Sequence, residues 1–141
     1  MPIENLRSPH AKVGPLAYFG RMLDKIRLHA AGKLPAEYQA NLGSGFDQRC
    51  VELLDIRYET LVLRVHEEGG SDEEILEWCF QAGQKPSLAL IEVWNEFMRK
   101  RGWNDDGSAR LQERLRESGF GDRKDIQTFF DYIDLDEGRI S

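Results

Sequence analysis

The sequence predicts an all-α protein that folds as a single compact domain of about six to seven short helices. Two observations support this fold class. Apolar residues recur at the three- and four-residue spacing that places side chains on one face of a helix, and no stretch of useful length alternates apolar and polar residues as a strand does. The chain of 141 residues suits one domain, and 40% hydrophobic against 31% charged residues is a globular composition.

The N-terminal part is predicted to be an arm followed by a helix. Residues 1–13 are expected to form an extended arm because their prolines disfavour a helix, and residues 14–141 are expected to form the helical domain. Pro15 suits the first position of a helix, where its missing N–H has no partner to lose. We therefore expect the first helix to begin near Pro15 and to stop at Gly32.

The middle of the chain contains a long loop and two further helices. Residues 33–45 show no periodicity and contain proline and glycine, as expected of a loop. Asp47 is predicted to cap the second helix, because its carboxylate can accept a hydrogen bond from a free backbone N–H. A third helix begins near Tyr58 and ends at the glycine pair that starts with Gly69.

The C-terminal half is predicted to contain four more helices. Ser71 opens a capping box, in which the serine side chain and a glutamate three residues later satisfy two backbone N–H groups. Ser87 is expected to cap the next helix, which Gly102 ends. A peripheral, highly charged helix covers about 109–118, and the last helix is expected to carry Ile126 on its apolar face.

Charge and composition exclude several functional classes. The net charge of −6 argues against nucleic-acid binding, which depends on a basic surface. The first 33 residues are nevertheless basic and the last 21 acidic, so the two ends could face each other, remain solvated, or offer an anion site at the basic end. The sequence has no signal-peptide pattern and no apolar stretch of membrane-spanning length, so we expect a cytoplasmic protein without a membrane partner.

No motif predicts a metal, a cofactor or a catalytic centre. Cys50 and Cys79 form no CxxC pair and are expected to be buried and free. The stretch Gly102 to Glu113 matches several ligand positions of a calcium-binding EF-hand loop, but glycine stands at the first ligand position, so a capped turn is the better interpretation. The acidic tail contains no His or Cys, and we predict no metal and no cofactor.

A group of polar residues on the first two helices and the loop between them forms the candidate ligand site. If the two helices pack together, their charged side chains could surround a small-molecule pocket, or they could form an ordinary salt-bridge network. A carboxylate could then act as a base and an arginine could hold an anion. The candidates for ligand binding are Asp24, Lys25, Arg27, Tyr38, Asp47 and Arg49.

An ordered series of short segments gives the sequence a family resemblance. The segments are SP near the start, RMLDKIRLHAAG, a loop with EY, DQR at a helix start, SDEEILEW, and WN in the next helix. This series resembles a bacterial domain-of-unknown-function family, number five thousand and sixty-nine. The match covers Ser8 to Met98, and residues after Trp103 lie outside it. The resemblance implies a helical fold and a bacterial source, and it implies no activity.

Two main functional hypotheses follow from these observations, and a nucleic-acid-associated role through the basic N-terminal arm is a third alternative. The first is a non-catalytic cytoplasmic binding or interaction module, whose partner is another protein or a second copy of the chain. The second is a small enzyme or metabolite binder that acts on an anionic small molecule through the polar groups of the first two helices. The sequence contains no catalytic signature that favours the second hypothesis over the first.

Overall fold

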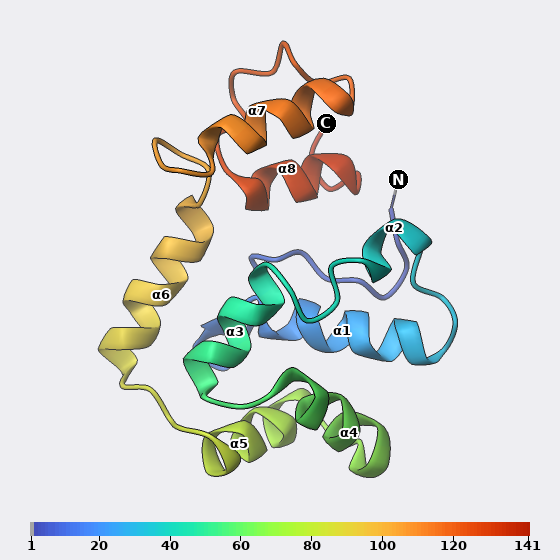
Figure 1. Ribbon diagram of the computed structural model, residues 1–141, viewed down its shortest axis with the longest axis vertical. Helices are drawn as coiled ribbons and strands as arrows, with labels where there is room; N and C mark the ends of the chain where they lie inside the picture. Colours follow the sequence, from blue (N-terminus) through green and yellow to red (C-terminus); the bar gives the residue numbers. More distant parts are fainter. Residues whose placement is uncertain (1) are drawn as a thin grey trace.

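The computed structural model describes residues 2–141 and is mainly helical (Figure 1). Helices α7 and α8 lie at one end, α1 and α3 in the middle, and α4 and α5 at the other end, while α6 runs along one edge (Figure 1). The elements are β1 Lys12–Val13, β2 Leu16–Ala17, α1 Phe19–Ala30, α2 Ala36–Gln39, α3 Phe46–Leu54, α4 Tyr58–Glu68, α5 Asp72–Ala82, α6 Leu88–Lys100, α7 Ser108–Glu117 and α8 Phe129–Asp136.

The sequence prediction lacked the small β-sheet and the short helix α2. The described residues contain a two-stranded antiparallel sheet, β1–β2, and eight helices, so the fold is mainly helical rather than strictly all-α. Each strand is only two residues long and α2 has only four residues. Elements this short span too few residues to display the periodicity on which the prediction depends.

The predicted start of the first helix was wrong. Gly14, at a φ of 55°, and Pro15 form the turn between β1 and β2, where Val13 pairs with Leu16. Helix α1 begins four residues later, at Phe19. The fixed φ of proline suits a tight turn as well as the first turn of a helix, so the local signal did not distinguish them.

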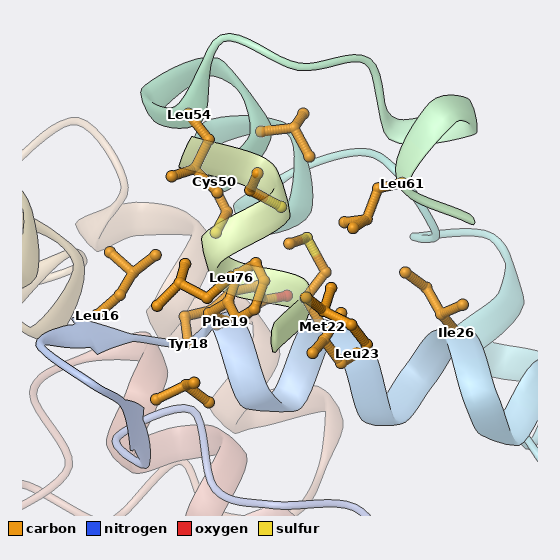
Figure 2. Packing of buried hydrophobic residues seen from close by; sticks show 14 of the residues in the cluster. Leu16, Tyr18, Phe19, Met22, Leu23, Ile26, Cys50, Leu54, Leu61 and Leu76 are labelled. Carbon is orange, nitrogen blue, oxygen red and sulfur yellow. The ribbon is translucent and has the colours of Figure 1, made fainter. Parts of the chain in front are cut away.

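Helix α1 lies at the centre of the larger hydrophobic core. Its side chains Phe19, Met22 and Leu23 are fully buried and pack against residues of α3, α4 and α5 (Figure 2). Each such side chain contributes roughly 1.5–3 kcal/mol when it is removed from water. Cys50 and Cys79 are buried and free, as predicted. Because α1 is buried on most of its surface, its polar residues also lie in the interior, where they form part of the candidate site.

A second, smaller core joins the C-terminal helices. Leu111 and Leu115 of α7 pack against Tyr132 and Leu135 of α8 and against Ile126. Ile126 precedes α8 instead of lying on it, and Thr128 caps the helix by accepting from the Asp131 N–H. The sequence-based start of this last helix was therefore too early.

The N-terminal arm contacts both α1 and the C-terminal segment. Leu6 is buried against Leu28 and Leu34. Ser8 Oγ donates to Asp134 of α8 at 2.9 Å, and the Arg139 guanidinium donates to the Leu6 carbonyl oxygen at 2.5 Å. The basic N-terminal and acidic C-terminal segments thus meet in the fold, which was one of the alternatives that the charge distribution left open.

The helix-capping predictions had mixed outcomes. The capping box at Ser71 and the serine cap at Ser87 are both present. Asp47 does not cap α3, because Gly45 occupies the N-cap position and Asp47 is buried in the first turn. No helix in the described part of the chain is long and apolar enough to cross a membrane.

Candidate functional site

A cavity of about 440 Å³ lies between the N-terminal helices α1–α3 and the C-terminal helices α7–α8. Its wall combines positively charged side chains with aromatic rings, a mixture that suits a small organic anion. The cations are Arg21, Lys25, Arg49, Arg101 and Arg114, the acids are Glu37, Asp136 and Glu137, and the rings are those of Tyr18, Tyr38, Phe46, Phe129 and Tyr132.

Two buried polar clusters lie beside this cavity, and Glu137 is the centre of the first. Arg21 on α1 donates to both carboxylate oxygens of Glu137, at 2.8 and 2.7 Å. Tyr38 on α2 donates to Glu137 Oε2 at 2.8 Å, and Arg139 donates to Oε1 at 2.7 Å. This Glu137 cluster ties α1, α2 and the C-terminal segment together through charge-assisted hydrogen bonds.

The second cluster joins α1 to the start of α3. Lys25 Nζ lies 2.8 Å from Asp47 Oδ1 and 3.0 Å from the hydroxyl of Tyr18, which donates to the same carboxylate oxygen at 2.6 Å. The other oxygen of Asp47 accepts from the Gly43 N–H at 3.0 Å. The Lys25 cluster thus holds a buried amine in contact with a carboxylate and a phenol.

The surroundings shift the pKa values of residues in and beside the Lys25 cluster. Burial lowers the pKa of Lys25, although the charge of Asp47 and a hydrogen bond with it act in the opposite direction. Burial, together with the negative charge of Asp47, raises the pKa of Tyr18 well above its ordinary value, so this phenol stays protonated. Burial also raises the pKa of the neighbouring Cys50 thiol, so this thiol stays protonated as well.

The cations of the cavity differ in how far they are neutralised. Arg21 and Lys25 have buried carboxylate partners, and Arg101 lies 3.4 Å from Asp105. Among residues 2–141, no carboxylate forms an ion pair with Arg49 or Arg114. The Arg49 guanidinium instead lies over the ring of Phe97, 4.9 Å from its centroid. Two arginines at the cavity wall therefore retain charge that is not compensated by an ion pair.

The structure separates the six predicted site residues into two groups. Lys25, Tyr38 and Arg49 line the cavity, and Asp47 lies behind Lys25 with a side chain that is 0% exposed. Asp24 and Arg27 lie elsewhere, since Asp24 binds Arg7 at 2.8 Å and Arg27 binds Asp72 at 2.8 Å. Asp24 and Lys25 are neighbours in sequence, but successive residues of a helix point in different directions.

Several residues of the cavity were missed by the sequence reasoning. Arg101, Arg114 and Glu137 line the cavity but were not among the predicted site residues. The uneven charge of the two chain ends was the signal that could have paired Arg21 with Glu137. No local pattern distinguishes an arginine that faces a cavity from one that faces water.

The loop that resembled a calcium site is closed by its own hydrogen bonds. The carboxylate of Asp105 accepts from the Gly102 and Gly107 N–H groups at 2.9 and 2.8 Å, and its own N–H donates to Ser108. This is the arrangement of a capped turn between helices. Across residues 2–141, no group of three or more His, Cys, Asp or Glu side chains is placed to hold a metal ion.

Comparison with known proteins identifies a family. The model of the family described as a domain of unknown function (DUF5069) matches residues 3–139. The match extends well beyond Trp103, where the resemblance recognised in the sequence ended, and it includes α7, α8 and the Glu137 cluster. A search of curated proteins returned no match. The chain therefore belongs to the DUF5069 family.

Proposed function

We propose that this protein is a binding module for a small organic anion, which it holds in the cavity between α1–α3 and α7–α8. The observation that carries the proposal is the pair Arg49 and Arg114, which line the cavity without a carboxylate partner among the described residues. Guanidinium groups bind carboxylates and phosphates in a two-pronged geometry, and their charge is strongest where water is partly excluded.

The rings of the cavity narrow the class of ligand. Phe46, Phe129 and Tyr132 line the same space as the arginines. Aromatic walls gain contact with a flat or apolar ligand body, whereas a bare inorganic ion leaves them unfilled. A volume of about 440 Å³ is within the range of small-molecule sites. The expected ligand is therefore a metabolite-sized molecule with a carboxylate or phosphate at one end.

The buried clusters support this function by making the cavity rigid. Arg21 with Glu137 and Lys25 with Asp47 hold α1 against the C-terminal segment and against α3. A wall that is ordered before the ligand arrives reduces the entropy lost on binding. Binding within the cytoplasm of a bacterial cell, as predicted from the sequence, is part of the same proposal.

Thermal unfolding in the presence of a panel of carboxylates, sugar phosphates and nucleotides tests this function. A ligand at about 100 times its Kd stabilises the native state by roughly 2.7 kcal/mol. We expect at least one anion to raise the Tm of the wild type and of Arg110→Ala, but not of Arg49→Ala or Arg114→Ala. Arg110 is the matched control, because it lies on α7 like Arg114 and pairs with the exposed Glu113.

Two results of this experiment would contradict the proposed function. If no anion in the panel shifts the Tm, or if the shift is the same in Arg49→Ala, Arg114→Ala and Arg110→Ala, the cavity does not bind anions. Each variant is first checked for an unchanged circular dichroism spectrum, so that a lost shift is not mistaken for lost folding.

The exposed apolar side chains of helix α6 support protein interaction as a second candidate function. Leu90, Val93 and Phe97 lie on one face of this helix and are 46%, 66% and 42% exposed. An apolar strip of this kind is unusual on a surface that faces only water. Pairing with a second copy of the chain predicts a dimer in light scattering that Val93→Lys converts to a monomer, and a monomeric wild type would exclude it.

A further inference from the structure

Lys25 differs from the other lysines of the chain in its burial. Its side chain is 6% exposed and lines the cavity, while the remaining lysines are on the surface. These exposed residues are Lys12, Lys33, Lys85, Lys100 and Lys124. A buried lysine is costly unless its charge is compensated or its proton is lost, and the Asp47 carboxylate that compensates Lys25 is also placed to take its proton.

The partners of Lys25 are those that an amine nucleophile requires. Asp47 Oδ1, 2.8 Å from Nζ, can take a proton from the ammonium group, and the Tyr18 hydroxyl, 3.0 Å from Nζ, can pass a proton on. Burial lowers the pKa of Lys25, which increases the fraction of neutral amine. Lysines whose charge is disfavoured by burial are the ones that attack carbonyl groups in proteins.

The backbone of Tyr18 is strained where it contributes to this cluster. Its φ is 68°, in the left-handed region that an aromatic residue rarely adopts. Hydrogen bonds from its N–H to the carbonyl oxygens of Pro9 and Ala11 hold this conformation, and the residue is 3% exposed within the larger core (Figure 2). The fold thus keeps an unfavourable conformation at the residue whose hydroxyl contacts both Lys25 and Asp47.

We propose that Lys25 forms a reversible imine with a small anionic aldehyde or ketone that enters the cavity. The inference rests on the proposed function, since Arg49 and Arg114 would bind the anionic group of that molecule while Lys25 reaches its carbonyl carbon. Tyr18 and Lys25 line one cavity with both arginines, so a single metabolite-sized ligand can contact all of them.

The reaction balances with the groups present. Asp47 accepts one proton from the Lys25 ammonium, and the neutral nitrogen attacks the carbonyl carbon. The carbonyl oxygen becomes a hydroxyl as it takes up that proton, and the nitrogen, positively charged after the attack, loses a proton through Tyr18 to Asp47. The carbon–oxygen bond then breaks, the oxygen leaves as water with the proton returned from Asp47, and the C=N bond forms. No oxidant or reductant takes part, and hydrolysis reverses the steps.

Reductive trapping tests the imine without any variant. The full chain is incubated at neutral pH with pyridoxal 5′-phosphate, or separately with the much smaller glyoxylate, and reduced with cyanoborohydride before peptide mapping by mass spectrometry. The exposed lysines are internal controls for unspecific labelling. Because burial lowers the pKa of Lys25 and so increases its fraction of neutral amine, we expect Lys25 to be labelled faster than any of them. Labelling of Lys25 by neither aldehyde, or no faster than the exposed lysines, overturns the proposal.

Variants separate the imine from simple anion binding. Tyr18→Phe keeps the ring and removes the hydroxyl, so it should slow labelling of Lys25. Tyr58→Phe should not, because the Tyr58 hydroxyl, although near Asp47, is hydrogen-bonded to neither Lys25 nor Asp47 within the described residues. Pyridoxine 5′-phosphate, which carries an alcohol in place of the aldehyde, reports anion binding alone. If it raises the Tm in an Arg114-dependent way while Lys25 stays unlabelled, the imine fails and the anion site stands. Rapid labelling of Lys25 that is unchanged in Arg49→Ala and Arg114→Ala supports the imine and contradicts the anion site.

Discussion

Removing the charge of Glu137 tests whether the C-terminal segment stabilises the fold through its buried ion pair. Glu137 is 3% exposed and Arg21 is 4% exposed, and the two side chains share two hydrogen bonds of 2.8 and 2.7 Å. Glu137→Gln keeps the shape of the side chain, but it leaves the buried guanidinium without a counter-charge and breaks one of these bonds. The loss of one partner of a buried pair costs about 3–5 kcal/mol.

The expected loss is a large part of the total stability. A domain of this kind unfolds with a free energy of about 5–15 kcal/mol. A loss of about 3 kcal/mol corresponds to a Tm lower by roughly 12 °C, at about 4 °C for each kcal/mol. Urea denaturation followed by circular dichroism measures the change, and an unchanged dependence on urea would show that the unfolded state is not affected.

Glu96→Gln is the control for the removal of a carboxylate charge. Glu96 pairs with Arg99 at 2.7 Å, but both side chains are about half exposed, at 48% and 51%. Such a surface pair contributes only about 0.2–1 kcal/mol, because water screens it. If Glu137→Gln is no more destabilising than Glu96→Gln, the reasoning about the buried pair is wrong and other contacts hold the C-terminal segment.

Three further predictions concern pH and local structure. Burial alone raises the pKa of Glu137, but the hydrogen bonds and charge of Arg21 lower it below the ordinary 4.5. The stability that the ionised Glu137 contributes is therefore complete above pH 4.5 and is lost as the pH falls through the pKa of the folded state. The free energy of unfolding should depend less on acidic pH in Glu137→Gln than in the wild type. Ser71→Ala removes the capping box of α5 and should lower the free energy of unfolding by about 1 kcal/mol in urea titrations, whereas an unchanged midpoint would deny the cap a role. Gly83→Ala would push a methyl group into the Leu54 carbonyl oxygen and should cost about 3 kcal/mol or more, and wild-type stability in this variant would contradict the close packing of α5 against the end of α3.

Much of the fold could be predicted because its signals are local. The helices from α3 to α7 follow from apolar spacing and from caps such as Ser71 and Ser87, whose hydrogen bonds are made within one turn. The start of α1 could not be predicted, because Pro15 suits both a helix and a hairpin. The missed helix, α2, is a single short turn with no buried residue of its own, so it leaves no apolar pattern.

The candidate site was predicted only in part. Lys25, Tyr38, Asp47 and Arg49 were chosen for their chemistry, and all four lie in or directly behind the cavity wall. Asp24 was chosen on the same grounds but does not line the cavity, and it binds Arg7 instead. Residue type and sequence order indicate which helices carry polar groups, and they do not specify which face of a buried helix meets a cavity.

The sequence by itself determined the helical class, most helix ends, the burial of both cysteines and the polar character of α1. Only the tertiary structure decided that Glu137 would neutralise Arg21 across more than a hundred residues of chain and that Arg114 would face the same space as Arg49. The physical reason is the separation along the chain over which each effect acts. Periodicity and capping act within a few residues, whereas a cavity forms where distant helices meet and their side chains do not fill the space between them.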